Sequence, residues 1–210
     1  MRKKQSPRVL AGAGLVLAMA MTGCSTGTDD KSVAEPGAAV AEVVPEQVPP
    51  EAEPLLERYG LTGMDTAEVI DHLDRLSGDD RPADLMASVR SNELIISSGE
   101  QEFTLDIPRD RFYLAFAPYV DQTHECFYHS LTTCTGELAS AEVRVQIVDK
   151  ANDKVVIDET TTTFENGFVG LWLPRDMEGT LWVSYNDKAG EIDITTDDDA
   201  PTCVTTLQLT

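Results

Sequence analysis

Five side chains that can bind a metal or exchange electrons gather in two short stretches of this sequence. His124, Cys126, His129 and Cys134 lie within one segment, and Cys203 lies near the end of the chain. Thiolate sulfur favours Cu(I) and Zn(II), and imidazole nitrogen also suits Cu(II), so this mixed set accommodates copper in both oxidation states. These five residues are therefore candidate ligands of a copper site, with zinc as a substitute metal.

The spacing of Cys126 and Cys134 restricts how this segment can fold. Their Cα atoms would be about 12 Å apart in a straight helix and about 26 Å apart in a straight strand. A disulfide needs Cα atoms within about 7 Å, and shared metal binding needs similar proximity. The chain must therefore fold back between the two cysteines, and the polar stretch 130–133 is the natural place. A sheet that ends with Cys203 could bring the third thiol to the same end.

The first residues have the pattern of an export signal. Arg2, Lys3 and Lys4 precede an apolar run over residues 9–21, and small residues lead to Cys24. A run of about 13 residues is shorter than the roughly 20 that span a membrane as a helix, which is typical of a signal peptide. We expect a lipoprotein signal peptide over residues 1–23 and lipidation of Cys24. The protein would then be exported and anchored to the cell membrane, facing the periplasm or another extracytoplasmic space.

Lipidation of Cys24 would leave three cysteines, an odd number, in the folded part. Outside the cytoplasm an unpaired thiol indicates metal binding, redox exchange or an intermolecular bond. A purely structural alternative remains open, in which Cys126 and Cys134 form a disulfide, Cys203 is a buried apolar residue and both histidines lie on the surface. A disulfide between these two cysteines would close only a short loop and would stabilise the fold by only about 2–3 kcal/mol.

The chain is strongly acidic, with 37 Asp and Glu against 16 Lys and Arg and a formal net charge of −21. This charge repels nucleic acid and anionic lipid and attracts cations. We therefore expect no nucleic-acid partner and no membrane contact except through the lipid. Residues 24–53 are rich in Ala, Val, Glu and Pro with few large side chains, which predicts a disordered, acidic tether.

The elements that must position the five residues are helical first and then β. Within residues 54–91, Asp65 with Glu68 predicts the start of one helix, and Pro82 predicts the start of a second. Helices this short need a partner surface, either the following sheet or a second copy in a homodimer. From residue 92 to residue 210, short runs with alternating apolar residues predict strands. The expected fold class is α+β, a short N-terminal helical part followed by a mainly antiparallel, β-sandwich-like, copper-binding domain.

Three stretches of the sequence resemble the CueP family of periplasmic copper-binding proteins. They are FYLAFAPY at residues 112–119, THECFYHSLTTC at 123–134 with Gly-Glu-Leu at 136–138, and TCVTTL at 202–207. The resemblance extends from about residue 55 to the end of the chain.

The resemblance implies that Cys126, Cys134 and Cys203 are the family's three cysteines, and that they bind copper and reduce Cu(II) to Cu(I). It also implies a helical part that dimerises and a β-rich part that holds the metal. The apparent lipid anchor and the long acidic linker depart from the enterobacterial members. Soluble members are associated with copper delivery to a periplasmic superoxide dismutase, whereas a tethered protein would sequester copper near the membrane.

Taken together, these features predict an extracytoplasmic protein that sequesters copper, reduces it and passes it to a copper-accepting protein, and so contributes to copper resistance. The reduction would be stoichiometric, because one pair of thiols supplies two electrons and then needs a thiol reductant. Two alternatives remain. One is a thiol-disulfide redox protein without a metal role, although no Cys-x-x-Cys pair is present. The other is a passive β-sandwich binding module.

Overall fold

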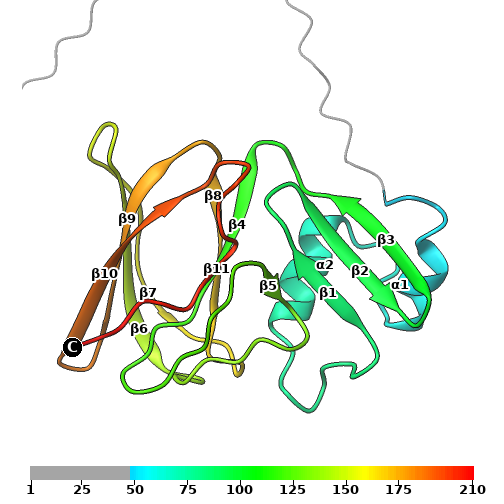
Figure 1. Ribbon diagram of the computed structural model, residues 1–210, viewed down its shortest axis with the longest axis horizontal. Helices are drawn as coiled ribbons and strands as arrows, with labels where there is room; N and C mark the ends of the chain where they lie inside the picture. The colour runs from blue at the N-terminus through cyan, green and yellow to red at the C-terminus, as the bar shows by residue number, and fades with distance from the viewer. Residues whose placement is uncertain (1–47) are drawn as a thin grey trace, which may run out of the picture. The chain divides into compact units, whose positions relative to one another are not determined.

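The computed structural model describes residues 48–210 and contains two short helices followed by mostly antiparallel strands (Figure 1). This arrangement confirms the predicted α+β class. The elements are α1 (Glu53–Arg58), α2 (Thr66–Asp74), β1 (Met86–Val89), β2 (Glu93–Ser98), β3 (Gln101–Asp106), β4 (Arg111–Phe116), β5 (His129–Ser130), β6 (Glu142–Asp149), β7 (Lys154–Thr162), β8 (Val169–Pro174), β9 (Glu178–Tyr185), β10 (Lys188–Thr195) and β11 (Cys203–Val204).

Helix α2 begins where the sequence predicts it. The Asp65 carboxylate accepts a hydrogen bond from the Glu68 backbone N–H, and the Glu68 carboxylate accepts one from the Asp65 backbone N–H, both at 2.9 Å. This reciprocal cap satisfies two amides that have no partner inside the helix. The helix buries an apolar face, and its last residue, Asp74, is buried as well.

The described part of the chain begins with a short stretch that leads into helix α1. Helix α1 starts at Glu53 with Pro54 in its first turn, and it buries Leu55 and Leu56 in the core. The predicted signal peptide, Cys24 and most of the predicted tether lie outside the described residues. Within the part of the chain that the structure describes, no helix combines the length and the apolar character needed to cross a membrane.

The second predicted helix is wrong, because the residues that follow Pro82 form strand β1. Ala87 and Val89 are buried while Met86 is exposed, which is the two-residue period of a strand. β1 pairs antiparallel with β2 on one side and with β5 on the other. In so short a stretch, periodicity alone does not separate helix from strand, and pairing with two neighbouring strands decides the outcome.

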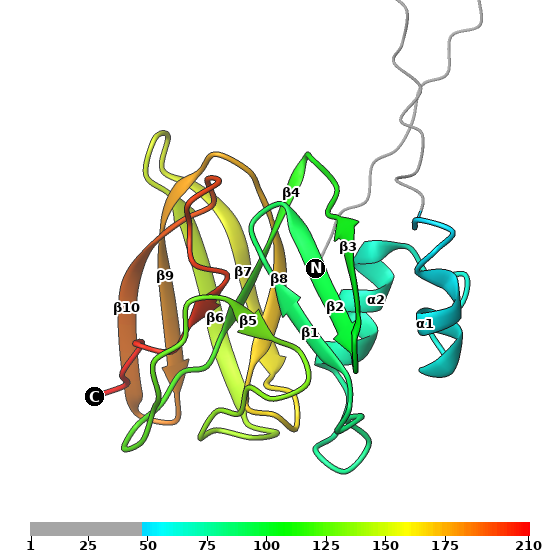
Figure 2. The same ribbon diagram turned by 45° about the vertical axis from the view of Figure 1, so that its right-hand side comes forward.

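Two hydrophobic cores share strand β4. Its residues Tyr113 and Ala115 belong to the core that includes both helices and the sheet β3-β2-β1-β5. Its residues Phe112, Leu114 and Phe116 belong to the core between the sheet β11-β4-β8 and the sheet β10-β9-β6-β7. Both faces of β4 are therefore buried, and the second core has the form of a β-sandwich (Figure 2).

Candidate metal centre

The cysteine segment reverses direction immediately after β5. The Cys134 backbone N–H donates to the Ser130 carbonyl at 3.1 Å, and the Leu131 N–H donates to the Ala87 carbonyl of β1 at 2.9 Å. The turn brings Cys126 Sγ and Cys134 Sγ to 3.6 Å. The predicted chain reversal between the two cysteines is therefore confirmed.

Cys203 reaches the same place because β11 pairs in parallel with β4, with Cys203 opposite Ala115. The Cys203 N–H also donates to the Phe127 carbonyl at 3.1 Å, which joins β11 to the cysteine segment. Cys126 and Cys203 form a disulfide with a Cα–Cα distance of 5.7 Å. Within residues 48–210, Cys134 is the cysteine left as a free thiol, and it is half-buried.

This pairing shows that the structural alternative, a Cys126–Cys134 disulfide with Cys203 as an unused apolar residue, is wrong. The cause is the pairing of β11 with β4, a contact between segments far apart in the sequence. The disulfide leaves the third thiol next to it, at hydrogen-bonding distance from Cys126. Such an arrangement permits thiol-disulfide exchange, because a thiolate can attack the neighbouring sulfur.

The two histidines of the segment have opposite surroundings. His124 is exposed, whereas His129 is fully buried. The His129 backbone N–H donates to Thr202 Oγ1 at 3.0 Å, and the His129 ring packs on Phe168 with 4.5 Å between ring centroids. The alternative in which both histidines lie on the surface is therefore wrong for His129.

The five predicted residues form two overlapping groups that could hold a metal. His124, Cys126 and Cys134 make an outer group, and His129, Cys134 and Cys203 make an inner group. Within each group the ligand atoms lie within 4.8 Å of one another. Bonds of about 2.0–2.3 Å to nitrogen and sulfur, as for zinc, allow ligand atoms to be up to about 4.6 Å apart. Once the Cys126–Cys203 disulfide is opened, each group therefore needs only small shifts of its ligand atoms. Cys134 belongs to both groups.

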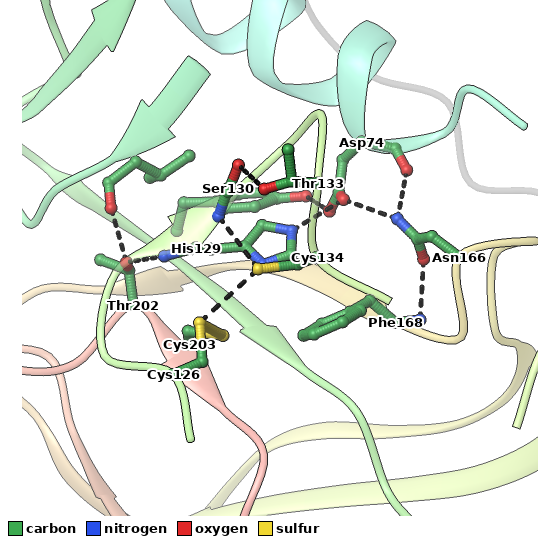
Figure 3. Close-up of polar contacts among 12 residues, drawn as sticks. Asp74, Cys126, His129, Ser130, Thr133, Cys134, Asn166, Phe168, Thr202 and Cys203 are labelled. Carbon is green, nitrogen blue, oxygen red and sulfur yellow. Dashed lines mark hydrogen bonds and ion pairs between the residues drawn. A yellow bond between two sulfur atoms is a disulfide. The ribbon is translucent and has the colours of Figure 1, made fainter. Parts of the chain in front are cut away.

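A buried carboxylate behind the inner group has no counterpart among the residues that the sequence predicts for the site. Asp74, at the end of α2, has its Oδ1 2.8 Å from His129 Nε2 (Figure 3). Tyr113 Oη donates to its Oδ2 at 2.6 Å, and Asn166 Nδ2 donates to its Oδ1 at 3.0 Å. One sequence signal could have indicated it, since Asp74 follows Ile70 by four positions and so lies on the apolar face of its helix.

These contacts fix the charges of the buried groups. Burial opposes the charge of Asp74, but His129 and the hydrogen bonds outweigh it and hold the pKa of Asp74 below its usual value. Burial also opposes the charge of His129, yet the Asp74 carboxylate raises the pKa of His129 to about 9. Burial favours the neutral thiol of Cys134, but His129 outweighs this effect and lowers the pKa of Cys134.

The result is a row of a carboxylate, an imidazolium and a thiol that tends towards the thiolate. The thiolate is the form that binds metals and attacks disulfides. Arg81 adds to this environment, because its Nη1 donates to the Cys134 carbonyl at 2.7 Å and holds the end of the turn. The fold and the site together define a β-rich protein with a cluster of thiols and imidazoles that could hold a metal ion.

Comparisons with known proteins identify the family. Residues 68–208 match the family described as "Periplasmic copper-binding protein CueP". A crystal structure of S.CueP is similar, with 41% sequence identity and a TM-score of 0.72, and the similarity covers 78% of this chain and 100% of that one. Among curated proteins, none matches the chain significantly. The chain belongs to the CueP family of periplasmic copper-binding proteins.

Proposed function

We propose that this protein takes up Cu(II) at the outer group, reduces it with its thiols and holds Cu(I) at the inner group. The observation that carries the proposal is that Cys134 belongs to an exposed group and to a buried group at once. Copper can then move from one group to the other without leaving its shared sulfur ligand.

Uptake begins at His124. Its exposed imidazole suits Cu(II), and it lines a shallow pocket of about 410 Å³ together with Thr123 and Glu137. Glu137 holds the approach to His124 in place, since its carboxylate accepts hydrogen bonds from the backbone N–H groups of residues 120, 121 and 122. The acidic surface of the protein raises the local concentration of cations.

Reduction uses Cys126 and Cys203 as the electron source. When their two thiols join, they release two electrons and two protons, and two Cu(II) ions each take one electron to become Cu(I). The Cys126–Cys203 disulfide is the oxidised product of this step. An external thiol reductant must open the disulfide before the next round, so the reaction is stoichiometric in the protein alone.

Retention of Cu(I) falls to the buried group. Soft thiolates favour Cu(I), and His129 adds a fully buried nitrogen ligand beside the half-buried Cys134. While the disulfide is closed, Cys134 and His129 are available, and opening it adds Cys203. The bound Cu(I) is sequestered there until it returns through Cys134 to the surface, where a copper-accepting protein takes it. These steps would contribute to copper resistance.

The location and the assembly belong to the same proposal. Lipidation of Cys24 would tether the protein to the cell membrane on its extracytoplasmic side, and the helical part would support a homodimer. Release from membranes on Cys24→Ser, and sedimentation of the purified protein, test these two points separately.

A second candidate function, thiol-disulfide exchange without a metal, is favoured by one observation. The Cys134 thiol lies 3.6 Å from Cys126 of the disulfide, and its pKa is lowered because His129 outweighs the effect of burial. Attack of Cys134 on Cys126 would form a Cys126–Cys134 disulfide and release the Cys203 thiolate. This candidate predicts turnover on protein disulfides in the presence of a copper chelator.

The test of the copper proposal is a thiol count during reduction. The reduced chain carrying Cys24→Ser has three thiols, and excess Cu(II) should oxidise two of them while two Cu(I) ions appear on a chromogenic chelator. Cys203→Ser removes one thiol of the electron-donating pair and should therefore slow the appearance of Cu(I). If Cu(II) left all three thiols intact, the proposed reduction would be wrong.

A further inference from the structure

We propose that Asp74 is a positioning residue for copper binding, which holds the His129 ring so that Nδ1 faces the sulfurs of Cys134 and Cys203. The inference rests on the inner group of the proposed function. Asp74 touches neither the metal nor the thiols in this account, and it acts only through His129.

The orientation of the ring follows from its contact with the carboxylate. His129 Nε2 and Asp74 Oδ1 are 2.8 Å apart, and both side chains are fully buried. Since an ionised carboxylate only accepts hydrogen bonds, Nε2 must carry a proton, which leaves Nδ1 for a metal. Figure 3 shows this second ring nitrogen turned towards the sulfur of Cys134.

The other ring nitrogen of His129, Nδ1, lacks a polar partner within residues 48–210. It is buried and has no hydrogen-bond partner among the described residues. Buried polar atoms almost always have a partner, so an exception needs an explanation. A metal bound between Nδ1 and the two sulfurs, which lie with the ring nitrogen inside a 4.8 Å group, would supply it.

Asp74 is in turn held by two neighbouring side chains. Tyr113 of β4 and Asn166, which precedes β8, donate to its carboxylate, and Asn166 Nδ2 also donates to its backbone carbonyl at 2.8 Å. A Cβ at Gly170 would overlap the Tyr113 hydroxyl and lie 3.0 Å from Asp74 Oδ2, so the glycine leaves room for this contact. The carboxylate therefore cannot turn away without breaking several buried hydrogen bonds.

The expected effect is a loss of metal affinity. Removing the carboxylate behind a metal-binding histidine typically lowers metal affinity by about 10–100-fold. Asp74→Asn keeps the size of the side chain but removes its charge, and its amide turns an N–H₂ group towards the donors around it. We expect this variant to bind Cu(I) at least about 10-fold more weakly. Tyr113→Phe is the matched control, because it removes one donor to Asp74 but keeps the bond between Asp74 and His129, and its effect should be smaller.

The test is a double-mutant cycle on the reduced full-length chain carrying Cys24→Ser. Cu(I) affinity is measured by competition with a chromogenic chelator for Asp74→Asn, for His129→Gln and for the two combined. Each single variant should bind more weakly, and the double variant should bind no more weakly than His129→Gln. An Asp74→Asn effect of equal size in both backgrounds, or no effect at all, would overturn the positioning role. If His129→Gln bound Cu(I) as tightly as the unmodified chain, the inner group of the proposed function would fall as well.

A second measurement does not depend on any variant folding. In histidine-labelled, Cu(I)-loaded protein, nitrogen NMR distinguishes a protonated ring nitrogen from a metal-bound one. We expect Nε2 of His129 to be protonated and Nδ1 to carry the metal. The opposite assignment would overturn the proposal, because Asp74 would then have no proton to hold.

Discussion

His124 and His129 lie five positions apart in the chain, yet one is exposed and the other is fully buried. His124 has Cys126 and Cys134 near its ring, and His129 has Cys134 and Cys203. The surroundings of the two rings differ, because the buried Asp74 carboxylate contacts His129 whereas His124 faces solvent. The exposed imidazole of His124 can meet a hydrated ion, whereas the buried imidazole of His129 is shielded from water.

One short segment therefore carries two imidazoles in different surroundings, because the fold buries His129 and leaves His124 exposed. The turn after β5 supplies the shared thiol, and β11 supplies the third sulfur from a distant part of the chain. The sheet formed by β10, β9, β6 and β7 carries no cysteine or histidine. Its apolar face packs against β4 and β11, so it supports the candidate site without contributing a candidate ligand.

The largest expected difference between the two histidines is in their contribution to the free energy of unfolding. Removing one partner of a buried ion pair typically costs about 3–5 kcal/mol, because the other charge stays buried without compensation. We expect His129→Ala to lower the free energy of unfolding by this amount, since it leaves Asp74 unpaired. His124→Ala should change it by no more than about 0.5 kcal/mol, as for other exposed side chains. Urea unfolding measures both, and equal losses would contradict the contrast.

Replacing the shared thiol should have the largest effect on binding. Cys134→Ser removes a ligand from both groups, so Cu(I) affinity should fall by more than the roughly 100-fold that the loss of a partner behind a ligand can cost. Cys126→Ser leaves the inner group complete and should have a much smaller effect. Both are measured by chelator competition on reduced protein. A larger loss in Cys126→Ser would place Cu(I) in the outer group instead.

The exposed histidine should control rate rather than affinity. We expect His124→Gln to slow the initial reduction of Cu(II) several-fold, because it removes the first imidazole that the ion meets. The final Cu(I) affinity should stay close to that of the unmodified chain, since the inner group is intact. Stopped-flow mixing with a Cu(I) chelator follows the rate. An unchanged rate with weakened affinity would reverse the roles of the two histidines.

The smallest expected effect is a shift in the pH dependence of the Cys134 thiol. Alkylation requires the thiolate, so its rate falls as the pH drops through the pKa of the thiol. Burial alone would raise that pKa, but His129 lowers it, so Cys134 should keep its reactivity to a lower pH than an ordinary thiol. His129→Gln removes the strongest influence that lowers this pKa and leaves burial opposed only by the Ser130 backbone N–H, so it should move the midpoint to higher pH. Iodoacetamide labelling of the oxidised Cys24→Ser chain measures it, and a midpoint that did not move would contradict the role of His129.

The sequence predicts the β-rich part of the fold well, because alternating residues such as Val143, Val145 and Ile147 have one buried face. It also predicts the cap of α2 and the chain reversal between Cys126 and Cys134. Strand β1 could not be predicted in the same way. Its four residues carry too little periodic signal, and pairing with β2 and β5 decides its conformation.

The candidate site was predictable in its residue types but not in its connections. The clustering of cysteine and histidine indicates the ligands, whereas the disulfide partner of Cys126 depends on the pairing of β11 with β4. Asp74 lies 55 residues before His129 in the sequence, and nothing in the local pattern joins them. The burial of His129 follows from this distant contact and from its packing on Phe168.

The central claim is that Cu(I) rests in the inner group, and X-ray absorption spectroscopy of the reduced, Cu(I)-loaded protein tests it most directly. We expect one nitrogen and two sulfur ligands, with the nitrogen lost in His129→Gln and kept in His124→Gln. Loss of the nitrogen in His124→Gln and its retention in His129→Gln would place Cu(I) in the outer group instead.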